Sequence, residues 1–202
     1  MRLFWIFIIS SFCWLSLSSQ AQIALLGGTN FCWMRNDNLL QHQEVLLSPH
    51  FGVSVQYYPF NNAPEISLEN GFLTNTKGYH LDIDKDYYFR LYYYSFPLLL
   101  NYSVSEQVTL STGLEFNYLK RTNVEQGTKT YNRFDMALVI GVEVFDAQTV
   151  NPYFRCSYGF FPVLNYYTFD KLGNLESEFR DLKSLVFSIG IKINLYDERI
   201  AF

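Results

Sequence analysis

Hydrophobic and polar residues alternate with a period of two along several segments of the chain. In the clearest segment, 108–118, the apolar positions are Val108, Leu110, Leu114, Phe116 and Tyr118. The same alternation runs through 134–144 and 185–195. Because successive side chains of a β-strand point to opposite faces, this pattern predicts strands with one apolar and one polar face. Each run has about 11 residues, the length that a tilted strand needs to cross a bilayer.

Weaker segments of the same kind bring the predicted number of strands to eight. The expected strands are 23–33, 47–58, 64–78, 87–102, 107–119, 133–146, 150–162 and 183–196. Pro97 cannot donate to a sheet ladder, so we expect it at a bulge or at the periplasmic end of its strand. An even number of strands is typical of a barrel that a single chain closes in a bacterial outer membrane. The pattern therefore predicts an all-β, eight-stranded, antiparallel, up-and-down transmembrane barrel.

The lengths of the connections between these strands alternate as well. Residues 34–46, 79–86, 120–132 and 163–182 form longer, polar connections, whereas 59–63, 103–106 and 147–149 are tight. If the first strand starts in the periplasm, every long connection falls outside the cell and every short one inside. Transmembrane barrels show this asymmetry, and a soluble sandwich has no reason to adopt it.

The N-terminal residues have the features of a secretory signal. Arg2 supplies a positive charge, and a mostly apolar stretch runs from 3 to 17. Small residues follow at Ser19 and Ala21, which predicts cleavage before Gln22. An uncleaved anchor would need roughly 20 apolar residues. We therefore expect a signal peptide over 1–21 and a barrel domain over 22–202.

The composition supports a membrane barrel and argues against other classes. Aromatic residues make up 19% of the chain, with 16 Tyr and 19 Phe, an excess that aromatic girdles at two membrane interfaces would explain. The formal charge of −4, without any cluster of Lys or Arg, excludes a polybasic nucleic-acid-binding protein, so no nucleic-acid partner is expected. Cys32 and Cys156 both fall in expected strands, and we expect them to be unpaired.

A set of charged residues is expected to point into the barrel. Its members are Glu69, Arg90, Glu115, Glu143, Arg155 and Lys192. An eight-stranded barrel is just wide enough for side chains to fill it, and charges buried there need partners. We predict a paired interior network that acts as a structural plug. The alternative is a path for protons or ions.

The histidines do not suggest a metal site or a cofactor site. His42, His50 and His80 lack His-x-His or Cys-x-x-Cys spacing, and scattered surface histidines are the expected outcome. A hydrolase set at the outer rim can be assembled from Ser48, His50, His80, Asp82 and Asp84, but most loop-rich chains allow such a set. We therefore expect no catalytic residues, no metal and no cofactor.

The long connection 163–182 mixes aromatic and charged residues. Tyr166, Tyr167 and Phe169 are its candidate partner-binding residues. The alternative is that they belong to the outer aromatic girdle or fold over the barrel mouth.

The segment Tyr92-Tyr93-Tyr94-Ser95-Phe96-Pro97-Leu98-Leu99-Leu100-Asn101-Tyr102 resembles the PorT-like outer-membrane β-barrel family of Bacteroidetes. Glu69-Asn70-Gly71-Phe72 and Thr112-Gly113-Leu114-Glu115 are similar to the Glu- and Gly-bearing strands of that family. The resemblance implies a barrel in the outer membrane. Members of the family include an accessory factor for type IX secretion and gliding, and the resemblance brings no catalytic residues.

These observations together favour a non-enzymatic accessory or scaffold subunit of an outer-membrane machine. Its expected partners are outer-membrane lipid and other outer-membrane or periplasmic proteins. The alternatives are an enzyme that acts on lipid or peptide at the barrel rim, a free-standing structural barrel, and a soluble lipocalin-like barrel.

Overall fold

The computed structural model describes residues 21–35, 43–60, 62–83, 85–123, 131–145, 149–164, 168–169, 175–176 and 182–197. All of the expected signal peptide except Ala21 lies outside these residues. The described part of the chain contains no helix long and apolar enough to span a membrane.

Eight long strands form the body of the structure. They are β1 (Ala21–Arg35), β3 (Leu46–Tyr57), β4 (Ile66–Ile83), β5 (Lys85–Ser105), β6 (Val108–Thr122), β7 (Phe134–Val144), β8 (Val150–Gly159) and β11 (Lys183–Asp197). Three two-residue strands accompany them, namely β2 (Gln43–Glu44), β9 (Thr168–Phe169) and β10 (Leu175–Glu176).

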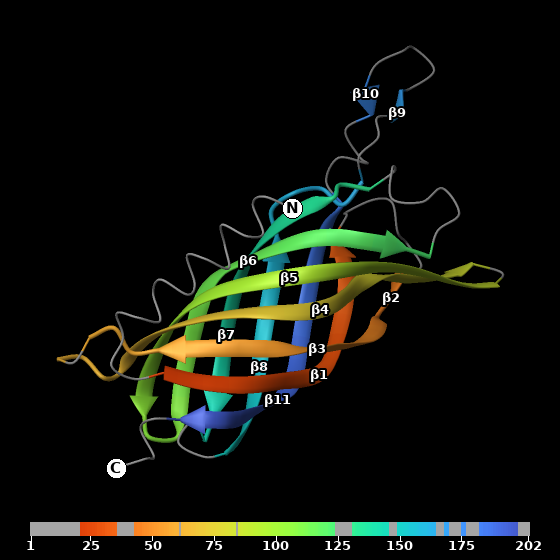
Figure 1. The fold of residues 1–202 in the computed structure, drawn as a ribbon. Coiled ribbons are helices and arrows are strands. Elements are labelled where there is room, and N and C mark those ends of the chain that lie inside the picture. Colours follow the sequence, from red (N-terminus) through yellow and green to blue (C-terminus); the bar gives the residue numbers. More distant parts are fainter. Residues whose placement is uncertain are drawn as a thin grey trace.

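The eight long strands close into one antiparallel barrel (Figure 1). Each pairs with its neighbours in the chain, and β1 pairs with β11 along nearly its whole length, from Gln22↔Asp197 to Arg35↔Lys183. Closure leaves no long sheet edge, which is the condition for strands to cross lipid. The predicted eight-stranded up-and-down barrel is confirmed.

The side chains are arranged inside out relative to a soluble barrel. Outward positions carry large apolar residues that are about half exposed, such as Phe51 at 63% and Ile140 at 59%. Inward positions carry polar residues that are fully buried, such as Asn30 and Asn101, both at 0%. Hydrocarbon would cover the outer face and the polar inner face would be shielded from it, as in transmembrane barrels. This distribution argues against the soluble lipocalin-like alternative.

The two ends of the barrel differ. One end, which we call the turn end, holds the start of β1, the end of β11 and the connections 58–65, 106–107 and 145–149. The other, the loop end, holds the connections 36–45, 123–133 and 160–182, together with the tip of the β4–β5 hairpin. Short turns of such barrels face the periplasm and longer loops face outward, so we expect the loop end to be the extracellular one.

The expected loop 79–86 is instead part of a long hairpin. Strands β4 and β5 stay paired up to Ile83↔Lys85. Figure 1 shows this hairpin reaching past the neighbouring strands at the loop end. Aromatic pairs across it explain the extension, because the rings of Tyr79 and Phe89 stack with centroids 4.6 Å apart.

Pro97 lies in the middle of β5, opposite Glu115 of β6, where that pairing is regular. The expected bulge or strand end at this position is therefore wrong. The pairing of β5 with β4 is interrupted between Asn70↔Leu98 and Leu73↔Ser95, next to the proline. The missing donor of Pro97 is thus accommodated by a local gap in one ladder.

Candidate functional site: the barrel interior

Four charged side chains form a network in the half of the barrel nearer the turn end. Arg155 of β8 donates to Glu69 of β4 at 2.9 Å and to Glu143 of β7 at 2.8 Å. Lys192 of β11 donates to the same two carboxylates, at 3.2 Å and 2.9 Å respectively. Two acids and two bases from four strands thus alternate around one point in the lumen. We call these four residues the lower network.

Neutral polar groups complete the contacts of the lower network. Gln56 accepts a hydrogen bond from Lys192 at 2.7 Å, and the amide of Asn101 donates to Glu69 at 3.3 Å. The side chains of Glu69 and Lys192 are fully buried. Removing a charge from water costs several kcal/mol, which is recovered only when the charge is both paired and hydrogen-bonded. The equal number of acids and bases meets that requirement.

A second ionic cluster lies nearer the loop end. Lys77 of β4 donates to Glu115 of β6 at 3.1 Å and lies 3.9 Å from a carboxylate oxygen of Asp135 on β7. The ring of Tyr93 lies beneath the Lys77 ammonium, with 5.6 Å between Nζ and the ring centroid. We call Lys77, Glu115 and Asp135 the upper cluster.

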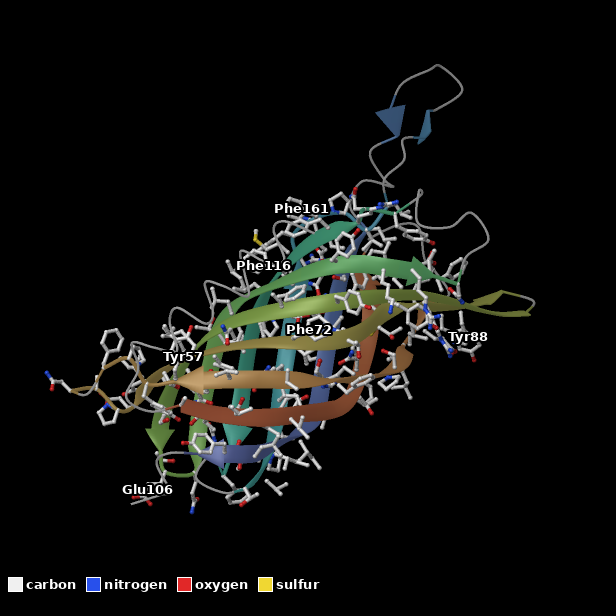
Figure 2. All side chains as sticks on the ribbon, in the orientation of Figure 1. Tyr57, Phe72, Tyr88, Glu106, Phe116 and Phe161 are labelled. Carbon is white, nitrogen blue, oxygen red and sulfur yellow. The ribbon has the colours of Figure 1, made fainter. Side chains whose placement is uncertain are left out.

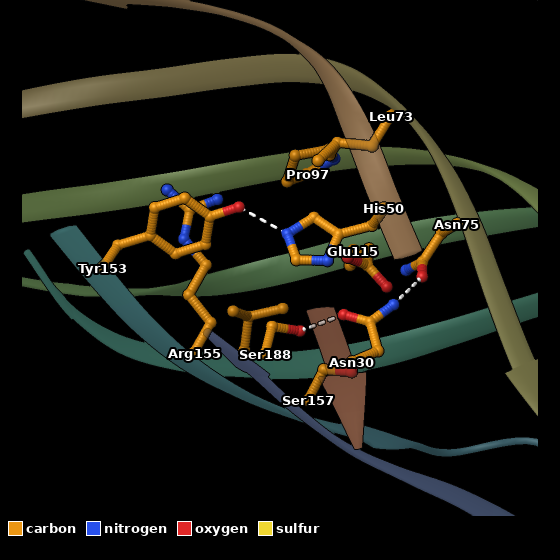
Figure 3. A pocket seen from close by; sticks show the side chains of 11 residues that line it. Asn30, His50, Leu73, Asn75, Pro97, Glu115, Tyr153, Arg155, Ser157 and Ser188 are labelled. Carbon is orange, nitrogen blue, oxygen red and sulfur yellow. Dashed lines mark hydrogen bonds between the residues drawn. The ribbon is translucent and has the colours of Figure 1, made fainter. Parts of the chain in front are cut away.

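A small cavity separates the two charged groups (Figure 3). Its volume is about 20 Å³, room for about one water molecule. His50 and Tyr153 meet across it through a hydrogen bond between the imidazole Nε2 and the phenol hydroxyl. Asn30 links Asn75 and Ser188 on another side of the same cavity. Polar side chains therefore cross the lumen at this level.

Two buried nitrogen atoms of residues that line the cavity find no partner within the described protein. These are His50 Nδ1 and Arg155 Nε, and both residues line the cavity. Buried donors and acceptors in folded proteins usually have a partner, either protein or water. A polar cavity of this size between such atoms fits one water molecule better than an apolar ligand.

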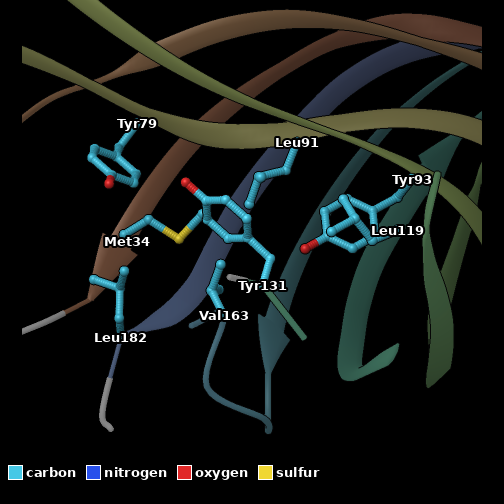
Figure 4. Packing of buried hydrophobic residues seen from close by; sticks show 8 residues of the cluster. All are labelled: Met34, Tyr79, Leu91, Tyr93, Leu119, Tyr131, Val163 and Leu182. Atoms are coloured by element: carbon cyan, nitrogen blue, oxygen red, sulfur yellow. The ribbon is translucent and has the colours of Figure 1, made fainter. Parts of the chain in front are cut away.

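An apolar cluster fills the interior at the loop end (Figure 4). It consists of Met34, Tyr79, Leu91, Tyr93, Leu119, Tyr131, Val163 and Leu182, all buried. Its members come from strands and from the connections beyond β6 and β8. The lumen is thus packed with apolar side chains at the outer mouth and crossed by polar networks below it.

Five of the six charged residues predicted for the interior point inward. Glu69, Glu143, Arg155 and Lys192 meet in one network, while Glu115 belongs to the upper cluster. The inward placement of Arg90 is wrong. Odd-numbered residues of β5, such as Leu91 and Tyr93, face the lumen, so Arg90 is exposed on the outside. Its guanidinium lies over the ring of Tyr88.

Lys77, His50 and Tyr153 were missed as interior polar residues, although the alternation contained a signal for all three. Lys77 has the same parity as Glu69 along β4, His50 has the same parity as Ser54 along β3, and Tyr153 has the same parity as Arg155 along β8. A strict reading of the period would have placed all three inside.

The described side chains of the suggested rim hydrolase do not assemble. His50 is buried in the lumen and contacts Tyr153, which corrects its expected surface position. Ser48 donates to the backbone oxygen of Thr76 at 2.6 Å. His80 is also buried rather than on the surface, with its imidazole stacked on Tyr88 and 3.0 Å from Glu44. His42 and Asp84 lie outside the described residues.

Other residues singled out in the sequence have simpler outcomes. Cys32 and Cys156 are both free thiols, one in the lumen and one half-buried on the outer side. Tyr166 and Tyr167 lie outside the described residues, and Phe169 is described only as backbone in β9. The partner-binding role of these three aromatics stays a prediction. The described part of the chain holds no group of three or more His, Cys, Asp or Glu side chains that could bind a metal ion.

A closed eight-stranded barrel with an apolar outer face and a polar, filled interior is an outer-membrane β-barrel protein. The chain belongs to the family described as outer membrane protein beta-barrel domain, which matches residues 18–165. The protein is therefore a component of the bacterial outer membrane. No curated protein matches the chain.

The solved structures to which this chain is similar are distant from it in sequence. Neisserial surface protein A is 10% identical, with a TM-score of 0.55 over 87% of this chain and 99% of that one. The attachment invasion locus protein Ail of Yersinia pestis is 14% identical, with a TM-score of 0.49 and coverage of 87% and 99%. OprG of Pseudomonas aeruginosa is 10% identical, with a TM-score of 0.44 and coverage of 89% and 97%. At such identities the likeness concerns the fold alone.

Proposed function

We propose that this protein is a non-conducting, non-enzymatic barrel that serves as an accessory or scaffold subunit of a larger outer-membrane assembly. The observation that carries the proposal is the filled interior. The lower network, the upper cluster and the apolar cluster at the loop end succeed one another along the described part of the lumen, and the cavity between the two ionic groups has a volume of about 20 Å³.

A filled lumen moves the functional surfaces to the outside of the barrel. Hydrated ions and small solutes need a continuous aqueous path, and side chains from different strands meet across this interior in the lower network, the upper cluster and the apolar cluster. What remains for function is the lipid-facing wall, the turns and the loop end. The loop end carries the longest connections, 123–133 and 160–182, and connections of this kind commonly carry binding residues.

The particular assembly that we propose is the type IX secretion and gliding machinery. The proposal rests on the PorT-like motif from Tyr92 to Tyr102, which forms the middle of the barrel wall in β5. The aromatic residues of the connection 163–182, Tyr166, Tyr167 and Phe169, are the partner-binding residues in this proposal. They match the composition of protein interfaces, where aromatic side chains are enriched.

Co-purification tests the accessory role. The tagged protein is extracted from native outer membranes in a mild detergent and run on a native gel, and co-migrating proteins are identified by mass spectrometry. We expect it to migrate in a large assembly with defined neighbours, and secretion components among them would support the specific machine. Migration at monomer size would instead favour a free-standing structural barrel.

Conductance in planar bilayers tests the closed interior separately. The purified protein is expected to give no stepwise ion current, whereas an open porin measured alongside gives discrete steps. Steady single-channel currents from the folded protein would contradict the non-conducting proposal whatever its partners are.

A further inference from the structure

Three cationic side chains and three tyrosines line the outer face of β5 and β6 near the loop end. The set comprises Tyr88, Arg90, Tyr92, Tyr94, Lys120 and Arg121, and we call it the cation–tyrosine strip. Tyr88 is 45% exposed and is labelled in Figure 2 near the tip of the β4–β5 hairpin. Arg90, Lys120 and Arg121 are all exposed.

Each cation of the strip lies over the face of one tyrosine. Arg121 lies 4.3 Å from the ring centroid of Tyr92, and Lys120 lies 4.8 Å from that of Tyr94. Arg90 lies 5.4 Å from the centroid of Tyr88. These distances are within the range of cation–π contacts, which hold a flexible cationic side chain in one orientation. The three charges are therefore fixed along one face of the barrel.

A β-bulge brings the two charges of β6 to the same face. The pairing shifts register between Tyr92↔Arg121 and Tyr93↔Leu119, so that Lys120 has no partner of its own in β5. In a regular strand Lys120 and Arg121 would point to opposite faces, and one of them would enter the apolar cluster of the lumen. The bulge instead leaves both exposed, which is how bulges re-aim side chains.

We expect the cation–tyrosine strip to lie at the outer interface of the membrane. Tyr94, Tyr118 and Phe134 are directly opposite one another on three adjacent strands. A row of outward-facing aromatic residues near one end of a barrel is typical of the girdle at which hydrocarbon gives way to headgroups. The three cations follow this level in the direction of the loop end, which is the extracellular side. They therefore face the headgroups of the outer leaflet.

The positive charge of the strip is not neutralised by the surrounding described residues. Among these, no carboxylate lies within 4.0 Å of Arg90, Lys120 or Arg121. Arg90 and Arg121 are diagonal neighbours across the ladder, since Arg121 pairs with Tyr92. Diagonal neighbours lie about 7–8 Å apart at their backbones, so both guanidinium groups can reach one headgroup.

We propose that the cation–tyrosine strip binds the phosphate groups of a phosphorylated glycolipid in the outer leaflet. Guanidinium groups recognise phosphate through paired N–H donors, and a lysine adds a further point charge. The exposed ring of Tyr88 offers an apolar face for the sugar that carries the phosphates. The site is on the barrel wall, so it does not depend on the proposed accessory role.

Native mass spectrometry of the purified full chain in detergent tests this site. The protein is titrated with diphosphoryl lipid A, and bound lipid is counted for the wild type and for a triple variant, Arg90→Gln with Lys120→Gln and Arg121→Gln. We expect the triple variant to bind about tenfold more weakly or worse, because three surface cations are lost. Lipid A without phosphates should bind the wild type as weakly as diphosphoryl lipid A binds the triple variant.

A matched control removes cations from the opposite side of the barrel. Arg35 and Lys183 form a pair between β1 and β11 at the same end, and the variant Arg35→Gln with Lys183→Gln should keep wild-type binding. The variants must retain the heat-dependent gel shift of a folded barrel. Equal losses in both variants, or equal binding of dephosphorylated lipid A, would each overturn the proposal.

Discussion

Lys192 of β11 and Glu143 of β7 meet inside the barrel, with 2.9 Å between Nζ and Oε2, although 49 residues separate them in the sequence. Strand β8 lies between their strands, and its Arg155 contacts Glu143 as well. The contact therefore joins two strands that are not neighbours in the sheet. Lys192 also contacts Glu69 of β4, so this one side chain links strands from the first and the second half of the chain.

Lys192→Met should destabilise the barrel strongly. The substitution leaves Glu69 and Glu143 buried with Arg155 as the only cation of the lower network. Removing one partner of a buried ion pair costs about 3–5 kcal/mol, and we expect a loss of that size in the free energy of unfolding in urea from lipid vesicles.

Lys183→Met is the control for that experiment, since it makes the same change at the outer end of the same strand. It should alter stability by less than about 0.5 kcal/mol. Adding Glu69→Gln to Lys192→Met restores equal numbers of charges and should recover part of the loss. If Lys192→Met proves as mild as Lys183→Met, the lower network does not contribute to stability as argued.

Glu115→Gln should lower the free energy of unfolding by less than Lys192→Met does. Lys77 loses its partner at 3.1 Å but keeps the carboxylate of Asp135 at 3.9 Å, so its charge is not left alone. We expect a decrease of about 1–3 kcal/mol in the free energy of unfolding, measured in urea from lipid vesicles.

Glu106→Gln is the control, because Glu106 lies in the exposed turn between β5 and β6. It should have no measurable effect on the free energy of unfolding. A decrease similar to that of Glu115→Gln would show that the barrel responds to the loss of any carboxylate.

The alternation of side chains made the barrel predictable from the sequence. Residues 108–118 and 185–195 contrast apolar and polar positions so clearly that the face of each residue follows from its parity. The same parity placed Glu115, Glu143 and Lys192 in the lumen. The number of strands and the asymmetry of the connections were predictable from the same contrast between apolar and polar positions, together with the residues typical of turns.

The prediction of which residues face inward failed where apolar and polar positions no longer alternate. Tyr92, Tyr93 and Tyr94 are consecutive and chemically identical, so no polarity difference tells which faces inward, and Arg90 was placed on the wrong side. The bulge at Lys120 inverts the parity of β6 beyond it, and no turn or glycine marks its position. Which charges pair depends on the stagger of non-adjacent strands, which a single sequence does not specify.

Gly28→Ala and Gly27→Ala should have opposite effects although the residues are neighbours in β1. A Cβ at Gly28 would lie 2.2 Å from the backbone oxygen of Ile189 and 2.9 Å from the His50 ring, whereas one at Gly27 meets nothing within 4 Å. We expect Gly28→Ala to lower the free energy of unfolding by about 1–3 kcal/mol through overpacking.

Gly27→Ala should be neutral or slightly stabilising, because alanine has less freedom to lose on folding. Unfolding in urea measures both variants under identical conditions. Equal stability of the two variants would mean that the wall near Gly28 can move outward to accept a methyl group, contrary to the close approach of β1 and β11.

Tyr153→Phe isolates the hydrogen bond at the centre of the lumen. The phenol hydroxyl contacts His50 Nε2, while the ring itself packs beneath the Arg155 guanidinium at 4.9 Å from its centroid. Phenylalanine keeps the ring and that contact but leaves the buried imidazole nitrogen without its partner. A buried polar atom that loses its hydrogen bond costs about 1–3 kcal/mol, and we expect a decrease of that size in the free energy of unfolding.

Tyr102→Phe, on the exposed outer wall of β5, makes the same change and should lower the free energy of unfolding by less than about 0.5 kcal/mol. Similar stability of Tyr153→Phe and the wild type would indicate that water in the adjoining cavity replaces the hydroxyl, so that the His50–Tyr153 contact does not hold the two walls together.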